Sequence, residues 1–121
     1  MTSALPIPSN DERRNHERRI LRVQAELILT GRPPMAVRTM DISEGGLSVL
    51  CPVNLPARTE CTVKVSLPLP PTGRKPVELR AVVRYSILSS SGGGFQLGMS
   101  VPVTDPVTAA AIKAYMNRPG F

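Results

Sequence analysis

Short segments of alternating apolar and polar residues predict that this chain is built mostly of β-strands. In Val23–Thr30 every second residue from Val23 to Leu29 is apolar, which is the pattern of a half-buried strand. The same reasoning gives five further strands, namely Val37–Ile42, Leu47–Cys51, Thr62–Leu67, Val77–Ile87 and Phe95–Val103. Six short antiparallel strands with little helix between them favour a small barrel that closes its own edges.

Turn-forming residues separate these segments. Gly31-Arg32-Pro33-Pro34 ends the first strand, and the serine- and glycine-rich stretch Ser89–Gly94 favours a flexible hairpin connection. Prolines crowd the stretch Pro68–Pro76. Because proline has no N–H to donate to a strand neighbour, we expect a loop there.

A single helix is predicted after the last strand, at about residues 105–117. Asp105 provides an acceptor side chain at the cap, and Pro106 has the backbone angle that suits the first helical position. Ile112, Tyr115 and Met116 recur at helical spacing and form one apolar stripe. We expect this helix to pack across one mouth of the barrel.

The length of 121 residues suits one domain with one modest core. Residues 1–17 show no apolar periodicity and are expected to form a flexible N-terminal arm, so the barrel domain would span residues 18–118. The chain has neither the eighteen or so consecutive apolar residues of a membrane span nor the order of a secretory signal. A soluble, cytoplasmic protein without membrane insertion is expected.

Charge points to an anionic partner. The net charge is +6, and twelve of the fifteen basic residues are arginine, the side chain best suited to two-pronged contacts with phosphate or guanine. The charge is scattered, however, and only four aromatic residues are present. Both observations argue against a track for nucleic acid. A high positive charge also keeps small domains soluble, so it does not by itself define a site.

The residues that usually carry catalysis or metal binding are scarce. His16 is the only histidine, and no cysteine or acid stands at metal-ligand spacing from it. Cys51 and Cys61 lie among apolar strand residues, where free thiols usually pack. No nucleophile elbow or phosphate-binding loop can be drawn. We therefore expect no enzyme, no metal and no cofactor.

The most informative feature is an arginine pair followed by an acidic glycine turn. Arg18 and Arg22 directly precede the first strand, and the string Asp41-Ile42-Ser43-Glu44-Gly45-Gly46 joins the next two strands. Arg14 with Arg18 offers a second frame for the pair. Taken alone, the turn could be an ordinary Asp/Ser turn in which glycine supplies a positive φ.

In this order the two motifs resemble those of the PilZ family of bacterial cyclic di-GMP receptors. The family pattern is Arg-x-x-x-Arg followed by Asp-x-Ser-x-x-Gly, which would place Arg18 and Arg22, then Asp41, Ser43 and Gly46, at the ligand. The resemblance implies a six-stranded antiparallel barrel with a C-terminal helix. It also implies a receptor or adaptor that changes its surface on ligand binding and regulates an unidentified effector protein in motility, biofilm or polysaccharide control.

The chemistry of these residues suits cyclic di-GMP. Guanidinium forks can bond to phosphate and to O6 and N7 of guanine, while the opposite guanine edge presents donors that need an acceptor such as Asp41. Ser43 can donate or accept, and Gly46 would let the backbone approach the ligand. Arg14 or Arg19 could assist. The number of ligands per domain and the oligomeric state stay open, as do two other functions: a nucleotide-free PilZ-like interaction adaptor and a small-barrel oligonucleotide binder.

Overall fold

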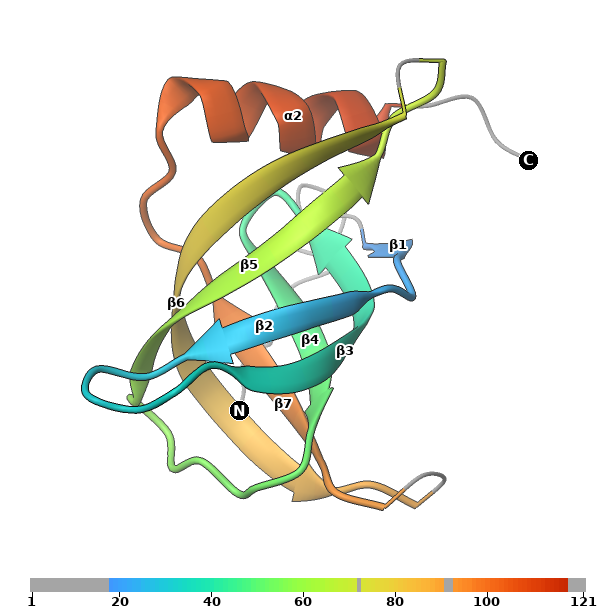
Figure 1. The fold of residues 1–121 in the computed structure, drawn as a ribbon. Coiled ribbons are helices and arrows are strands. Elements are labelled where there is room, and N and C mark those ends of the chain that lie inside the picture. Colours follow the sequence, from blue (N-terminus) through green and yellow to red (C-terminus); the bar gives the residue numbers. More distant parts are fainter. Residues whose placement is uncertain (1–17, 72, 91–92, 118–121) are drawn as a thin grey trace, which may run out of the picture.

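The structure is a computed structural model that describes residues 18–71, 73–90 and 93–117. It contains seven strands and one helix in these residues (Figure 1). In chain order they are β1 (Arg19–Ile20), β2 (Gln24–Ile28), β3 (Met35–Ser43), β4 (Gly46–Cys51), β5 (Glu60–Pro68), β6 (Arg74–Leu88), β7 (Phe95–Ser100) and α2 (Pro106–Met116).

Strands β2 to β7 form a closed antiparallel barrel. Their order is β3-β2-β5-β6-β7-β4, and an additional pairing of β3 with β4 closes the ring. The two-residue strand β1 pairs with the part of β3 that β2 leaves free. This arrangement confirms the expected all-β class with six barrel strands and one C-terminal helix.

Alternating residues of the strands fill the barrel, as the sequence pattern predicts. The fully buried side chains include Leu27, Ile42, Val49, Val63 and Leu97, one from each of five strands. Residues between them face outward because successive side chains of a strand point to opposite faces. The core is therefore the barrel interior, and the outer face is free to carry chemistry.

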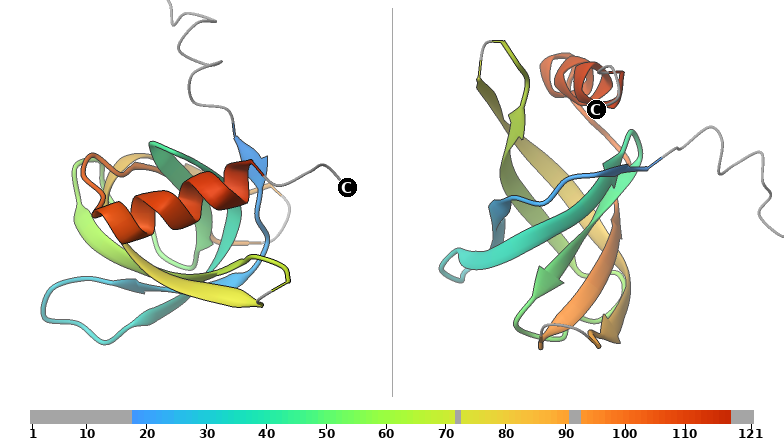
Figure 2. Two further views of the ribbon diagram at one scale, coloured as in Figure 1. Left: turned by 90° about the horizontal axis from the view of Figure 1, so that it is seen from above. Right: turned by 90° about the vertical axis from the view of Figure 1, so that its right-hand side faces the viewer.

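Helix α2 covers one mouth of the barrel (Figure 2). Its inner side buries Ala111, Ile112 and Tyr115. At its start the Thr108 amide donates to Asp105 Oδ1 over 2.6 Å, and this bond lowers the pKa of the Asp105 carboxyl. The cap and the apolar stripe thus agree with the prediction. At eleven residues α2 is short, and the described ranges contain no helix long and apolar enough to cross a membrane.

The largest boundary differences from the prediction lie at the proline-rich loop and at the end of the last strand. The loop expected at Pro68–Pro76 is shorter, because Pro68 lies in β5 and Arg74 to Pro76 lie in β6. Proline is tolerated there because β7 pairs only with the later part of β6, from Val82 on, which leaves one edge of its first half without a strand neighbour. The last strand ends at Ser100 rather than Val103. The arm expected at residues 1–17 lies outside the described residues.

Cys51 and Cys61 are buried and form no disulfide, as expected. Their Sγ atoms lie 3.5 Å and 3.7 Å from the sulfur atoms of Met35 and Met99. Burial raises the pKa of the Cys61 thiol to about 11. Because the thiolate is the reactive form, this thiol stays protonated and inert near neutral pH.

Candidate functional site

The fold brings the arginine motif and the acidic turn into direct contact. Arg18 Nη1 lies 2.6 Å from Asp41 Oδ1, across 23 residues of sequence. The side chains are 50% and 28% exposed. Ile20 of β1 pairs with Asp41 of β3, so Arg18, two residues earlier, lies on the same outer face. An exposed cation and an exposed carboxylate therefore meet on the outside of the barrel.

A bend between β1 and β2 fixes the position of Arg22. The Leu21 amide donates to the Met40 carbonyl over 3.0 Å, and the Val23 amide donates to Thr39 Oγ1 over 2.9 Å. The buried Thr39 hydroxyl also donates to the Leu21 carbonyl. Arg22 stands between these two anchors. Its side chain is exposed and makes no hydrogen bond or ion pair with the described residues.

Ser43 and Gly46 shape the turn rather than present polar groups to solvent. Both are buried and pair with each other across Glu44 and Gly45. Ser43 Oγ accepts from the Gly45 amide and donates to the Gly46 carbonyl, each over 3.3 Å. These bonds hold the turn that ends the strand carrying Asp41.

Gly46 does not supply the positive φ of the ordinary Asp/Ser turn that was considered as the alternative. The positive-φ glycines of the described chain are Gly31, Gly73, Gly93 and Gly94, so this turn does not use a positive φ. A Cβ at Gly46 would collide with the backbone carbonyl oxygen of Met99 on β7. Gly46 is therefore required for the close approach of β4 and β7.

Arg19 contacts α2 and is not brought to Asp41. Its Nη1 donates to the carbonyls of Tyr115 and Met116 over 3.2 Å and 3.1 Å, and its guanidinium lies 5.5 Å from the centre of the Tyr115 ring. The Tyr115 hydroxyl donates to the Ile20 carbonyl over 2.7 Å. The cation suits the negative end of the helix dipole. Arg19 thus ties β1 to the end of α2.

The strand register adds two residues that the sequence reasoning missed. Ile20, Asp41, Ser48, Gly98 and Tyr85 are successive cross-strand partners over β1, β3, β4, β7 and β6. Ring atoms of Tyr85 occupy the space where a Cβ of Gly98 would lie. The buried Ser48 hydroxyl has no hydrogen-bond partner among the described residues. We call these five residues the outer row. It extends the Asp41 surface with the Tyr85 ring, which is 44% exposed, while the Ser48 hydroxyl lies buried in the row.

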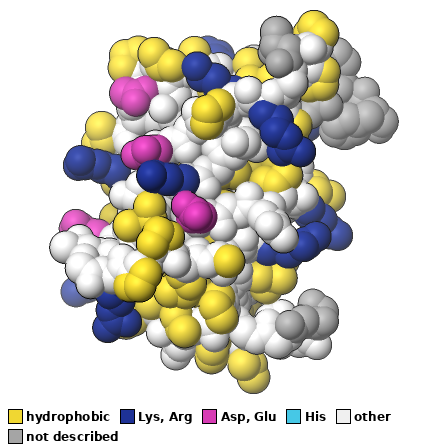
Figure 3. Space-filling model, in the orientation of Figure 1, with side chains coloured by type: hydrophobic (Ala, Val, Ile, Leu, Met, Phe, Trp, Pro, Cys, Tyr) yellow, Lys and Arg dark blue, Asp and Glu magenta, His cyan; other side chains and the backbone are white. Residues whose placement is uncertain are grey.

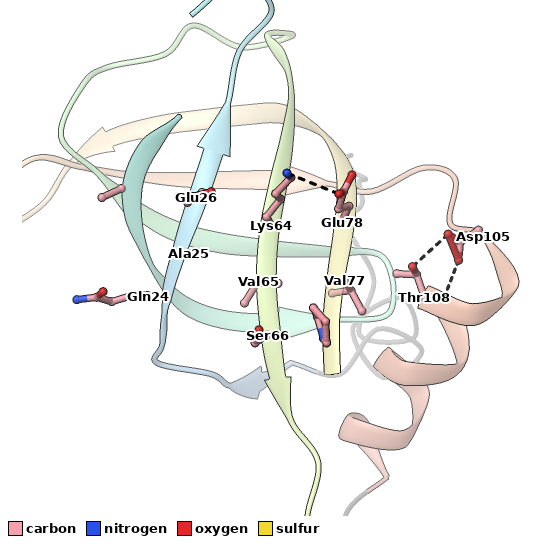
Figure 4. Close-up of a pocket in the computed structure, with 12 residues that line it drawn as sticks. Gln24, Ala25, Glu26, Lys64, Val65, Ser66, Val77, Glu78, Asp105 and Thr108 are labelled. Atoms are coloured by element: carbon pink, nitrogen blue, oxygen red, sulfur yellow. Dashed lines mark hydrogen bonds and ion pairs between the residues drawn. The ribbon is translucent and has the colours of Figure 1, made fainter. Parts of the chain in front are cut away.

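Two grooves of the surface lie away from these residues. An open groove of about 730 Å³ runs between β2, β5, β6 and the start of α2 (Figure 4). Lys64 and Glu78 form an ion pair of 3.8 Å in it. A second groove, of about 970 Å³, contains Arg80, Pro102 and Val103. Neither groove includes Arg18, Arg22 or Asp41, so the candidate site lies outside both grooves.

Two further residues considered in the sequence, Arg14 and His16, lie outside the described residues. Within the described part of the chain no three His, Cys, Asp or Glu side chains are grouped so that they could hold a metal ion.

The bend that positions Arg22 can be tested through Thr39. Replacing Thr39 by valine keeps the volume but leaves the Val23 amide without its acceptor, and we expect a loss of about 1–3 kcal/mol in the free energy of unfolding. Urea denaturation measures it. Serine at position 39 retains the hydroxyl and is the matched control, expected to lose less than valine. Equal losses in the two variants would show that the hydroxyl does not hold the bend.

Comparisons with known proteins agree with the fold and with the family that the sequence resembles. The sequence matches the PilZ domain over residues 12–118. No curated protein matches it. The fold is similar to that of the Bacillus subtilis inhibitor of motility (MotI/DgrA), with a TM-score of 0.74 and 15% sequence identity over 93% of this chain and 56% of that one. This chain therefore corresponds to little more than half of that protein. Because the family match spans nearly the whole barrel and its helix, the chain belongs to the PilZ domain family.

Proposed function

We propose that this domain is a cyclic di-GMP receptor that binds its ligand on the outer face formed by Arg18, Arg22 and Asp41. The observation that carries the proposal is the contact of 2.6 Å between Arg18 and Asp41. It joins the two parts of the PilZ motif on an exposed surface, with the free guanidinium of Arg22 held four residues from Arg18.

Each group has a counterpart on the ligand. Arg22 supplies up to five N–H donors for a phosphate or for O6 and N7 of guanine. Arg18 can exchange its carboxylate partner for a phosphate, and Asp41 is then released to accept from N1 and the exocyclic amine of a guanine. Tyr85 continues this surface at the far end of the outer row, where it offers a ring face to a base.

Signalling would follow from the place of β1. Arg18 belongs to the ligand surface, whereas the neighbouring Arg19 holds the end of α2. A ligand that draws Arg18 away from Asp41 would displace β1 and so change the surface between β1 and α2. In this proposal an effector protein binds to the changed surface and controls a process such as motility.

Titration calorimetry tests the receptor role most directly. Arg22→Ala removes an exposed side chain that makes no hydrogen bond or ion pair with the described residues. The stability of the variant should therefore stay unchanged while its affinity for cyclic di-GMP falls by about tenfold or more, because a charge-assisted hydrogen bond contributes about 1.5 kcal/mol or more. Arg32→Ala, in the exposed turn between β2 and β3, is the matched control and should bind as the wild type does. Equal affinities for Arg22→Ala and Arg32→Ala would contradict the proposed site.

A nucleotide-free adaptor is the second candidate function. Arg18 and Asp41 already neutralise each other in the structure, which a domain without ligand would also need. This candidate predicts no heat with cyclic di-GMP at any concentration. Titrations with GTP and with a short oligonucleotide complete the comparison, because an oligonucleotide binder would show affinity that falls steeply with salt.

A further inference from the structure

The end of β6 carries an exposed apolar patch on the part of the barrel away from α2. We define this patch by Val53, Tyr85, Ile87 and Leu88, whose exposed fractions are 42%, 44%, 52% and 74%. Figure 3 shows hydrophobic side chains gathered at the lower end of the molecule, where β6 ends in Figure 1. Neighbouring apolar residues that are both exposed are unusual in a strand, since one of the two normally faces the core.

One edge of this part of β6 has no strand partner. β7 pairs with Val82 to Leu88 on one side, but β5 pairs with β6 only as far as Val82. Two backbone hydrogen bonds then link Val83 to Arg58 and Thr59. At Ile87 and Leu88 no described strand pairs with β6 on the side opposite β7. An open edge of this kind can accept an extended segment of another chain.

Two arginines flank the apolar patch. Arg58 is anchored beside β6 by its amide, which donates to the Val83 carbonyl over 2.7 Å, and Arg84 immediately precedes Tyr85. Both side chains are exposed, and neither forms an ion pair with the described residues. Glu60, the acid closest to them by strand register, forms no such pair either. The charge next to the patch is therefore positive and available to a partner.

The backbone of Arg58 adds a separate observation. Its φ is 76°, and it is the only non-glycine residue with positive φ in the described chain. This conformation is unfavourable for a side chain with a Cβ, and glycine would adopt it freely. Strained residues of this kind often belong to binding sites. The strain suggests that the guanidinium at position 58 serves a purpose that glycine could not.

We propose that the end of β6 is a docking site for an extended, acidic segment of an effector protein. Apolar side chains of that segment pack on Val53 and Leu88, its backbone pairs with the open edge at Ile87 and Leu88, and its acidic residues face Arg58 and Arg84. A second copy of this chain fits less well, because it would bring the same positive charges together. The docking site shares Tyr85 with the nucleotide surface, and its other residues are separate from Arg18, Arg22 and Asp41.

Fluorescence anisotropy without cyclic di-GMP tests the docking site. The probe is a labelled synthetic peptide with two acidic residues followed by alternating valine and threonine. Leu88→Lys should weaken its binding by about tenfold or more, and Arg58→Gly or Arg84→Ser by severalfold. Val107→Lys changes an exposed valine at the opposite mouth of the barrel and should leave binding unchanged. The same peptide with N-methylated alternate amides, or with lysines in place of its acids, should not bind.

Thermal unfolding shows whether a variant that loses peptide binding is still folded. Arg58→Gly relieves the unfavourable φ, so its Tm should equal or exceed that of the wild type even as peptide binding falls. Absence of binding to the wild type, equal binding by all variants, or equal binding of the lysine peptide would overturn the proposal. Concentration-dependent dimerisation that Leu88→Lys abolishes would instead assign the patch to a second copy. A failed nucleotide titration would leave these results unaffected.

Discussion

Replacing Gly46 by alanine is expected to destabilise the barrel by about 3 kcal/mol or more, enough to unfold a large fraction of a marginally stable domain. The new Cβ would meet the Met99 carbonyl oxygen. That oxygen belongs to the backbone of β7, so no side-chain rotation relieves the collision and the β4–β7 pairing must shift. Urea denaturation followed by circular dichroism measures the loss.

Gly98→Ala is the matched control for this prediction. There the Cβ would meet the Tyr85 ring, a half-exposed side chain that can turn away, so the expected loss is about 1 kcal/mol. The displaced ring should nevertheless lower affinity for cyclic di-GMP, since Tyr85 ends the outer row. Similar stabilities of the Gly46 and Gly98 variants would show that the strands can separate enough to admit a side chain. Lost ligand binding in Gly46 variants should accordingly be attributed to folding.

Much of the fold was predictable from local patterns. The alternation in Val23–Thr30 predicted β2, and Asp105 with Pro106 predicted the start of α2, because each signal depends on neighbours a few residues apart. The boundary at Pro76 was not predictable in this way. Whether a proline fits a strand depends on whether its N–H side has a partner, and that is decided by how far β7 extends along β6.

The candidate site was predictable only in part. Sequence spacing selected Arg18 and Asp41, and the structure brings them together. Sequence spacing could not show that Arg19 is not at the site. Only the pairing of β1 with β3 decides that Arg18 faces outward and that Arg19 reaches α2. Ser48 and Tyr85 were missed for the same reason. They lie in the same row as Asp41 because of the register of four strands, and no local sequence pattern predicts that register.

Substituting Arg18 and Asp41 singly and together should show whether each side chain contacts the ligand or only positions the other. The two side chains are 50% and 28% exposed, so their ion pair contributes at most about 1 kcal/mol to folding. Arg18→Ala and Asp41→Ala should therefore fold normally. Each should bind cyclic di-GMP about tenfold more weakly, because each removes charge-assisted hydrogen bonds to a different part of the ligand.

The double variant decides between the two roles. If Arg18 and Asp41 each contact the nucleotide, the double variant binds more weakly than either single variant, by up to about a hundredfold relative to the wild type. The loss departs from a simple sum because the two side chains are in contact in the free protein. If Asp41 acts only by holding Arg18 in place, removing it after Arg18 is gone costs nothing further, and the double variant binds as Arg18→Ala does. Calorimetry on the four proteins, with Arg32→Ala as the charge-matched control for the arginine, measures the difference. We expect the double variant to bind more weakly than Arg18→Ala, since a guanine edge that presents only donors requires the carboxylate whether or not Arg18 is present.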